Sequence, residues 1–377
     1  MRIFLAHSKM VYTTAVIIAA SLSGHGQEGP PRSDKLIPVA DLGKRRAIGV
    51  SVSSDNRLFV SFPNRAEAYK YGLTEIIDGK PLPYPNEEWN AHSGDSAGRF
   101  INVQDLYVDT EDNLWVLDSK PAPKGSIFGG QPGEALPNEG AFKLLKIDLT
   151  SNQVERVYTF EDIDKRTAGL NDMRIDTDKN LAYLSDPGRA AILVLDLVSG
   201  RSRTVLRDQS CTMADPDMVL TYDGREMRDH NGNPFRSNVN GIALTKDNRY
   251  FYFKPINKLN LYRVETRYLA DTSLTDEELA DHVEDLGETT VTHGLIADSN
   301  GNIYLSSSTD YSIKYRTPAG EIKTLVQDAR IIWPDSFGIG SDGYLYFSCA
   351  QLQRDPQWNG GEDRVEYPYR IYKVKLP

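Results

Sequence analysis

Cysteine is scarce in this sequence: 377 residues contain only two, Cys211 and Cys349. In an oxidising compartment the two thiols could form a disulfide, but two cysteines so far apart do not establish one. Neither has a histidine within a few residues, whereas a nucleophilic thiol needs an activating neighbour. The sequence therefore leaves the disulfide open and disfavours thiol catalysis.

A net positive charge and phosphate-binding loops are also lacking. The formal net charge is -10 and the isoelectric point about 5.2, and an acidic surface repels the phosphates of nucleic acids. No basic run, Walker motif or dinucleotide-binding glycine loop is present. We therefore expect neither nucleic acid nor a nucleotide as a partner.

Long apolar runs are confined to the N-terminus. Val11–Leu22 is apolar, follows the positive charges of Arg2 and Lys9, and precedes small residues up to Gly26. This pattern predicts a signal peptide over residues 1–26. The alternative is a retained anchor, although the run is shorter than the roughly 20 residues that span a bilayer. We expect a secreted or periplasmic protein with no stable membrane insertion after cleavage.

The rest of the chain contains one pattern six times: an alternating strand, a turn rich in Asp, Asn and Gly, and a second strand with aromatics. The copies are Gly49–Phe62, Asp105–Asp118, Asp172–Asp186, Gly241–Lys254, Gly294–Ser307 and Ser336–Cys349. Each copy reads as a β-hairpin, and spacings of roughly 40–70 residues suit four-stranded blades. The sequence predicts an all-β fold, a six-bladed β-propeller in a single domain over residues 36–377.

Three further expectations follow from the repeat. Leu36–Leu42 should complete the last blade by pairing with Tyr369–Val374, which would join the two ends of the mature chain. The acidic turns should be structural rather than calcium loops, because they recur six times. Only Leu274–Leu286 looks helical, with Thr275 as its N-cap.

The candidate site follows from aligning the six hairpins. In a propeller the innermost strand of each blade lines the central channel, and the residue before it lies at one channel mouth. These residues are Ile48, Gln104, Asn171, Asn240, His293 and Asp335. Oxygen ligands converging on one axis could hold a hard cation, or the same groups could bind a polar small molecule. The alternative is that they only satisfy backbone groups and water.

His293 and Asp335 are the candidate catalytic pair, because imidazole can transfer protons near neutral pH. Gln104, Asn171, Asn240 and Trp333 are candidate substrate-binding residues. Trp358 also lies near a loop and could face a ligand, whereas Trp115 sits in a repeat position and is expected in the core. Ser336 lacks a glycine elbow, which disfavours a serine nucleophile.

Several stretches, in order along the chain, resemble the yellow and major royal jelly protein family. They are Gly49–Pro63, Leu82–Asn90, Asn102–Lys120, Gly169–Gly188, Val239–Pro255, Trp333–Arg354 and Tyr367–Leu376. The resemblance implies a six-bladed, usually secreted propeller. It also implies a choice of activities, since members include dopachrome-converting enzymes, binders of aromatic amines, and nutritional or structural proteins.

A more distant similarity to gluconolactonase and regucalcin propellers implies a divalent cation, such as calcium, at the channel mouth. Asn171 and Asn240 match the two asparagines of that site. Ile48 stands where a Glu is expected, and His293 stands where an Asp is expected, although Asp335 could substitute. If a metal is present, its ligands would be Asn171, Asn240 and Asp335, with affinity weakened by the lost charge.

Three functional hypotheses result. The first is an isomerase or tautomerase that moves a proton within a small polar, aromatic or quinonoid substrate. The second is a binding protein for an amine-like small molecule, without turnover. The third is a metal-dependent lactone hydrolase.

Overall fold

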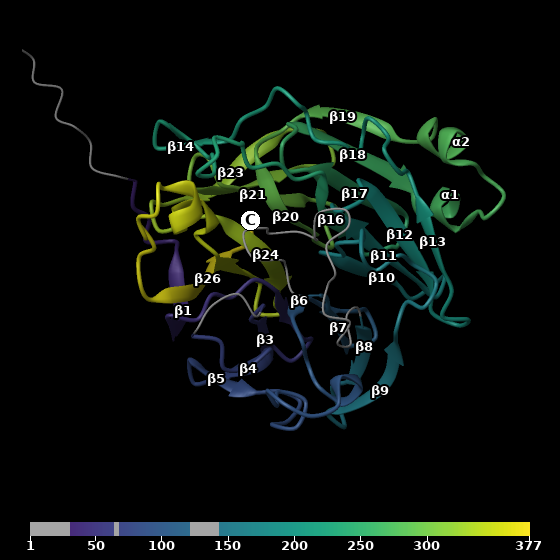
Figure 1. Cartoon of the computed structure of the whole chain (residues 1–377), viewed down its shortest axis with the longest axis horizontal. Coiled ribbons are helices and arrows are strands. Elements are labelled where there is room, and N and C mark those ends of the chain that lie inside the picture. Colours follow the sequence, from purple (N-terminus) through teal and green to yellow (C-terminus); the bar gives the residue numbers. More distant parts are fainter. Residues whose placement is uncertain (1–30, 64–67, 121–142) are drawn as a thin grey trace, which may run out of the picture.

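Six four-stranded antiparallel sheets form a ring around a central channel in the computed structural model (Figure 1). The structure describes residues 31–63, 68–120 and 143–377. The predicted signal peptide, residues 1–26, lies outside them. The described residues confirm the all-β, six-bladed propeller in one domain, and none of their helices is long and apolar enough to cross a bilayer.

Each predicted hairpin supplies the two innermost strands of one blade. From the channel outward, blade one contains β2 (Val50–Val52), β3 (Leu58–Ser61), β4 (Leu73–Ile77) and β5 (Lys80–Pro83). Blade two contains β6 (Val103–Val108), β7 (Asn113–Asp118), β8 (Lys143–Asp148) and β9 (Gln153–Tyr158). Blade three contains β10 (Met173–Asp176), β11 (Leu181–Asp186), β12 (Ala191–Asp196) and β13 (Ser202–Val205).

Blades four to six follow the same order, and the last one takes its outer strand from the N-terminal part of the chain. Blade four contains β16 (Val239–Leu244), β17 (Tyr250–Pro255), β18 (Asn260–Glu265) and β19 (Glu284–Glu288). Blade five contains β20 (Thr292–Ala297), β21 (Ile303–Ser307), β22 (Ser312–Arg316) and β23 (Ile322–Gln327). Blade six contains β24 (Pro334–Ile339), β25 (Tyr344–Cys349), β26 (Tyr369–Lys375) and β1 (Ile37–Gly43). A small hairpin, β14 (Thr221–Tyr222) and β15 (Arg225–Glu226), lies between blades three and four.

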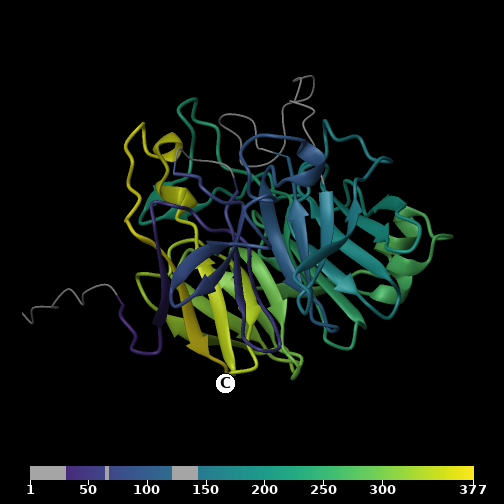
Figure 2. The same cartoon turned by 90° about the horizontal axis from the view of Figure 1, so that it is seen from below.

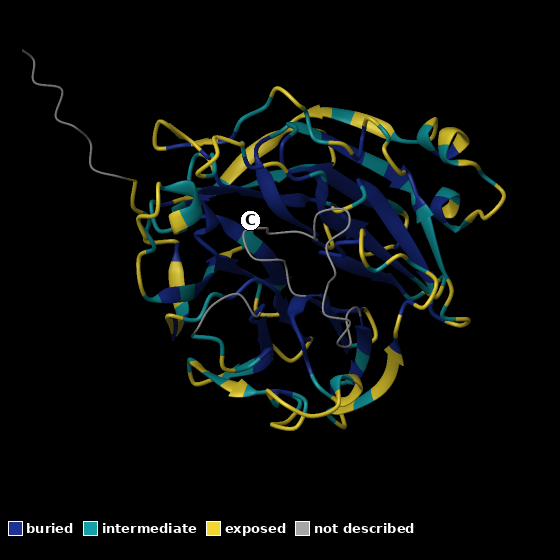
Figure 3. Cartoon of the chain, viewed as in Figure 1, coloured by how far each residue is buried: buried dark blue, intermediate teal, exposed yellow. Residues whose placement is uncertain are grey.

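Burial decreases from the channel to the rim. The innermost strands are almost entirely buried and contact one another around the whole ring, in the order β2, β6, β10, β16, β20, β24 and back to β2. Outer strands such as β9 and β19 are largely exposed (Figure 3). The hydrophobic core lies between the faces of adjacent blades: Trp115 of blade two and Leu184 of blade three belong to one cluster.

The predicted helix at Leu274–Leu286 is shorter than expected. α2 covers only Asp276–Ala280, where Thr275 and Glu278 form a capping box. The remainder leads into β19, because its backbone pairs with β18 to complete blade four. A second short helix, α1 (Thr266–Ala270), was not predicted.

The acidic turns are structural, as predicted. In four blades the turn carboxylate accepts a hydrogen bond from an aromatic side chain of the following strand. The pairs are Trp115 Nε1 to Asp109 (2.7 Å), Tyr183 Oη to Asp176 (3.0 Å), Tyr304 Oη to Asp298 (2.9 Å) and Tyr346 Oη to Asp342 (2.7 Å). These bonds tie the two innermost strands together at the turn.

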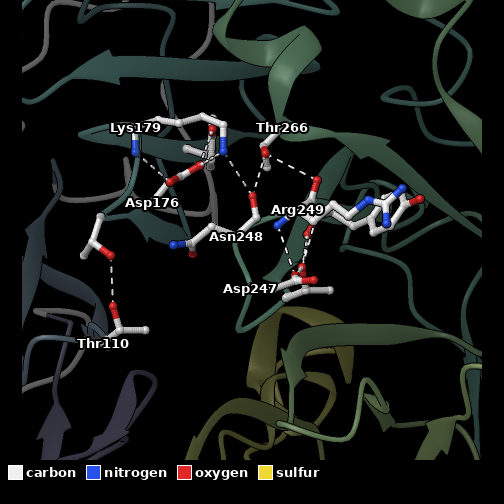
Figure 4. A network of polar contacts seen from close by, with 11 residues as sticks. Thr110, Asp176, Lys179, Asp247, Asn248, Arg249 and Thr266 are labelled. Carbon is white, nitrogen blue, oxygen red and sulfur yellow. Dashed lines mark hydrogen bonds and ion pairs between the residues drawn. The ribbon is translucent and has the colours of Figure 1, made fainter.

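Polar contacts between turns also connect neighbouring blades (Figure 4). Lys179 Nζ donates to Asp176 Oδ2 (3.1 Å) within blade three and to the Asn248 carbonyl oxygen (3.4 Å) of blade four. Thr266 Oγ1 donates to the same carbonyl at 2.6 Å. The turn face is therefore held by a shared network rather than by separate loops.

Both cysteines are free and buried. They lie in different core clusters, and burial raises the pKa of Cys211 to about 11 and that of Cys349 to about 12. The question left open by the sequence is thus settled against a disulfide within the chain. The raised pKa values also oppose thiolate chemistry.

The ring closes through β1 and β26, as predicted from Leu36–Leu42. Their antiparallel pairing runs from Ile37 opposite Lys373 to Gly43 opposite Tyr369. Leu42 of β1 and Ile371 of β26 are fully buried in one cluster. Closure therefore combines a hydrogen-bonded ladder with apolar burial.

Leu42→Ala should lower the free energy of unfolding by about 2–5 kcal/mol, because it leaves a cavity in the closing blade. Ile37→Ala, on the exposed part of the same strand, is the matched control and should cost less than about 0.5 kcal/mol. Urea denaturation measures both. Equal effects of the two substitutions would show that β1 contributes no core to closure.

Candidate functional site

Three of the predicted mouth residues, Asn240, His293 and Asp335, lie at β-bulges. In blades four, five and six, two residues at the start of the inner strand face one residue of the next strand. The facing sets are Asn240 and Gly241 with Lys254, His293 and Gly294 with Ser306, and Asp335 and Ser336 with Ser348. A bulge re-aims its side chains, so this backbone feature positions the ring of candidate residues.

Glycine at the second bulge position lets neighbouring blades approach closely. A Cβ added to Gly241 would lie 2.7 Å from the His293 carbonyl oxygen, and one added to Gly294 would clash with the Asp335 carbonyl oxygen. The backbones of Asn240, His293 and Asp335 are therefore side by side at the mouth.

Two predicted substrate-binding residues form a hydrogen-bonded chain. Gln104 Nε2 donates to Asn171 Oδ1 (3.0 Å), and Asn171 Nδ2 donates to Asp172 Oδ1 (2.8 Å). Gln104, Asn171 and Asn240 are all buried, whereas Asp335 is half-buried and the most open residue of the predicted ring.

Arg174 spans the channel and was missed by the sequence reasoning. Its Nη1 donates to Asp105 Oδ2 of β6 (3.3 Å), and its Nη2 donates to the Leu295 carbonyl oxygen of β20 (2.8 Å). The guanidinium also lies over the Tyr107 ring, 5.4 Å from its centroid. One side chain of blade three therefore brings positive charge between blades two and five.

Asp172 is a second residue that the sequence reasoning missed. Burial raises its pKa well above the ordinary value, and the negative charges of Asp105 and Asp335 raise it further, against the opposing effect of Arg174. The shift favours the protonated form of this carboxyl group. A signal was present: blades two and three begin their inner strands with Asp105 and Asp172, where the other blades have glycine or serine.

His293 is neutral and stacked on Trp333. The two ring centroids are 3.8 Å apart with planes 17° from parallel. Burial first, and then the charge of Lys254, lower the His293 pKa well below its ordinary value. Neither ring nitrogen has a hydrogen-bond partner among the described residues, so no hydrogen bond joins His293 to Asp335, its predicted catalytic partner.

Lys254 is a buried cation without a carboxylate partner among the described residues. It stands opposite the bulge in blade four. At the equivalent position four other blades have a serine: Ser61, Ser185, Ser306 and Ser348. Its Nζ donates to the Thr290 carbonyl oxygen and to Thr289 Oγ1 (3.4 Å). Burial lowers the pKa of Lys254 to about 7.

The described residues do not fit the calcium site implied by the distant similarity. The Asn171 side-chain oxygen, one of the three expected ligand oxygens, already accepts the Gln104 hydrogen bond. Arg174 adds a positive charge that repels a cation. No group of three or more His, Cys, Asp or Glu side chains within residues 31–63, 68–120 and 143–377 could hold a metal ion.

Residues 101–375 match the Major royal jelly protein family. The chain belongs to this family. Similar relatives include Major royal jelly protein 1 of Apis mellifera, 27% identical over 51% of this chain and 43% of that protein, and Protein yellow of Drosophila melanogaster, 24% identical over 66% and 47%. These alignments span less than half the length of either relative.

Solved structures share the fold of this family member. A gluconolactonase from Xanthomonas campestris has a TM-score of 0.52 and 11% identity, covering 91% of this chain and 89% of its own. A luciferin-regenerating enzyme has a TM-score of 0.53 and 13% identity, covering 93% and 98%. At such identities the likeness shows the propeller architecture and nothing about activity.

Arg174→Met should lower the free energy of unfolding by about 3–5 kcal/mol, because it leaves Asp105 as an uncompensated buried charge. The double variant Asp105→Asn/Arg174→Met should recover part of that loss. Arg166→Met, which breaks the exposed ion pair with Asp164, should cost less than about 1 kcal/mol. Urea denaturation of the three variants decides; no recovery in the double variant would contradict the pairing.

Lys254→Met should change how stability depends on pH. Because the folded pKa is about 7 and the unfolded value 10.5, the unfolded chain binds more protons between these limits, and stability rises with pH there. The variant should lose up to about 1.4 kcal/mol per pH unit of that slope. Urea denaturation at pH 7, 8 and 9 measures the free energy of unfolding of both proteins. Identical slopes against pH would show that Lys254 is charged in the folded state, which would contradict the prediction.

Proposed function

We propose that this protein is exported and that its channel mouth binds a small polar, aromatic or quinonoid molecule and transfers a proton within it. The observation that carries the proposal is the His293 imidazole: it is neutral and stacked on Trp333, and neither ring nitrogen has a hydrogen-bond partner among the described residues. The apolar run at Val11–Leu22 supports export. Proton transfer within a substrate is also among the activities that the sequence resemblance implies.

A neutral imidazole can relay a proton. One ring nitrogen accepts a hydrogen bond and the other donates one, so His293 can take a proton with one nitrogen and release another from the second. Burial disfavours the imidazolium, and the two transfers must therefore occur together. The tautomerisation is redox-neutral, and no further reactant is needed.

The surrounding groups have distinct roles in this mechanism. Asp335, the half-buried carboxyl of the predicted ring, takes the substrate proton and passes it to one nitrogen of His293, whose other nitrogen returns a proton to the substrate. The raised pKa of Asp172 favours its protonated form, which can donate one hydrogen bond to a developing negative charge on the substrate. Gln104, Asn171 and Asn240 orient substrate oxygens, and Trp333 supports the imidazole.

Binding of a cationic amine without turnover is the second candidate. Asp335 is the one carboxyl group among the six aligned mouth residues, and the whole chain carries a net charge of -10. Such a field attracts cations. A metal-dependent lactone hydrolase is disfavoured, because the Asn171 oxygen already accepts the Gln104 hydrogen bond and Arg174 repels a cation.

With dopachrome as the probe substrate, His293→Asn should lower kcat by about 100-fold or more, the usual contribution of a proton-transferring group. Asp335→Asn should have a similar effect. His282→Asn is the matched control, because His282 stacks on Tyr268 in the outer part of blade four. Steady-state kinetics measures all three.

The kinetic outcomes separate the candidate functions. Unchanged kcat in both mouth variants would remove the proposed mechanism. Native protein that binds amines by calorimetry but never turns over dopachrome would favour the binding protein. Because the His293 pKa lies well below 6.5, native kcat should show no loss between pH 7.5 and 6.5 from imidazole protonation.

A further inference from the structure

A second hollow lies at the rim of the mouth face, apart from the channel. It has a volume of about 350 Å³, within the range of small-molecule sites. The β14–β15 hairpin forms one wall, and the segment after β25, with its short 3₁₀ helices Leu352–Arg354 and Pro356–Trp358, forms the other. Figure 2 shows both segments rising on the same face of the ring.

Gln353 is the unusual residue of this rim pocket. The residue is only 8% exposed, yet neither Oε1 nor Nε2 of its side chain has a hydrogen-bond partner among the described residues. Trp358, which also lines the pocket, buries an unpartnered indole N–H. Buried polar groups without partners are costly, so three such atoms in one pocket indicate a missing partner rather than accidental packing.

The charges of the lining balance. Three arginines face three carboxylates, and the charged members are Arg225, Arg354, Arg364, Asp223, Glu226 and Glu366. Most are engaged: Arg354 pairs with Glu366, and Arg364 pairs with Glu362 outside the lining. The Arg225 side chain makes no ion pair or hydrogen bond with any described residue, so the pocket keeps one guanidinium available for a carboxylate.

Aromatic side chains pack against one another behind the wall of the pocket. Phe235 packs edge-on against both Trp358 (centroids 5.7 Å apart) and Trp333 (5.6 Å). Tyr222, which lines the pocket, packs against Trp333 at 5.8 Å and is held by a hydrogen bond to Ser308. An aromatic column thus fixes the wall that separates the rim pocket from His293.

We propose that the rim pocket binds a free zwitterionic amino acid with a carboxamide side chain. The Gln353 amide pairs with the ligand amide, donor to acceptor and acceptor to donor. The Trp358 N–H and Arg225 bind the ligand carboxylate, and the lining carboxylates hold its ammonium group. This site is independent of the proton-transfer function proposed for the channel.

The test is calorimetric titration of the full chain with L-glutamine, and with L-leucine as the ligand lacking the amide. Gln353→Met keeps the shape of the side chain but removes both polar atoms, and it should weaken glutamine binding by roughly tenfold, as expected for a lost hydrogen-bonded pair. Trp358→Phe removes the indole donor and should weaken binding severalfold. Gln357→Met, in the same segment but outside the lining, should bind like the native protein.

Each outcome supports or overturns the proposal. Glutamine binding that exceeds leucine binding and falls in both pocket variants supports it. No glutamine binding, equal binding of leucine, or full binding by Gln353→Met overturns it. If Gln353 is merely a poorly satisfied core residue, Gln353→Met raises the melting temperature and leaves the titration unchanged. Trp358→Phe keeps the test decisive should Gln353→Met fail to fold.

Discussion

The pairing of β1 with β26 is the constraint on which the rest of the molecule depends. A sheet offers unpaired backbone groups at its edges, and a ring of separate blades would be held by side-chain packing alone. By adding an N-terminal strand to a C-terminal blade, the chain joins its ends with a hydrogen-bonded ladder. Only in the closed ring do all six inner strands contact their neighbours, so the site exists only after closure.

Crowding at the axis sets the electrostatics as well as the geometry. The strands approach so closely that glycine is required beside His293 and Asp335, and Asp172, His293 and Lys254 are buried. Low dielectric then penalises charge, which raises the pKa of Asp172 and lowers the pKa values of His293 and Lys254. The rim pocket differs because it is open enough to keep charged groups of both signs.

Much of the fold could be predicted because its signals are local. The alternation of apolar residues, the acidic turns and the Thr275 cap depend on residues a few positions apart, and each appears at its expected place. The helix beyond Ala280 was the exception, because pairing with β18 outweighed local preference. The alignment of hairpins also located the mouth residues, since bulges recur at equivalent positions.

The sequence by itself determined the six repeats, the closing strand and the family resemblance. Only the tertiary structure decided which side chains meet at the channel mouth. Arg174 reaches from blade three to blade five, Asn171 accepts the Gln104 hydrogen bond, and His293 stacks on Trp333 with no hydrogen-bond partner for its ring in the part of the chain that the structure describes. The physical reason is the distance along the chain between the residues that interact. Hairpins arise from neighbouring residues, whereas contacts across a channel and the burial that shifts a pKa depend on six blades packed together.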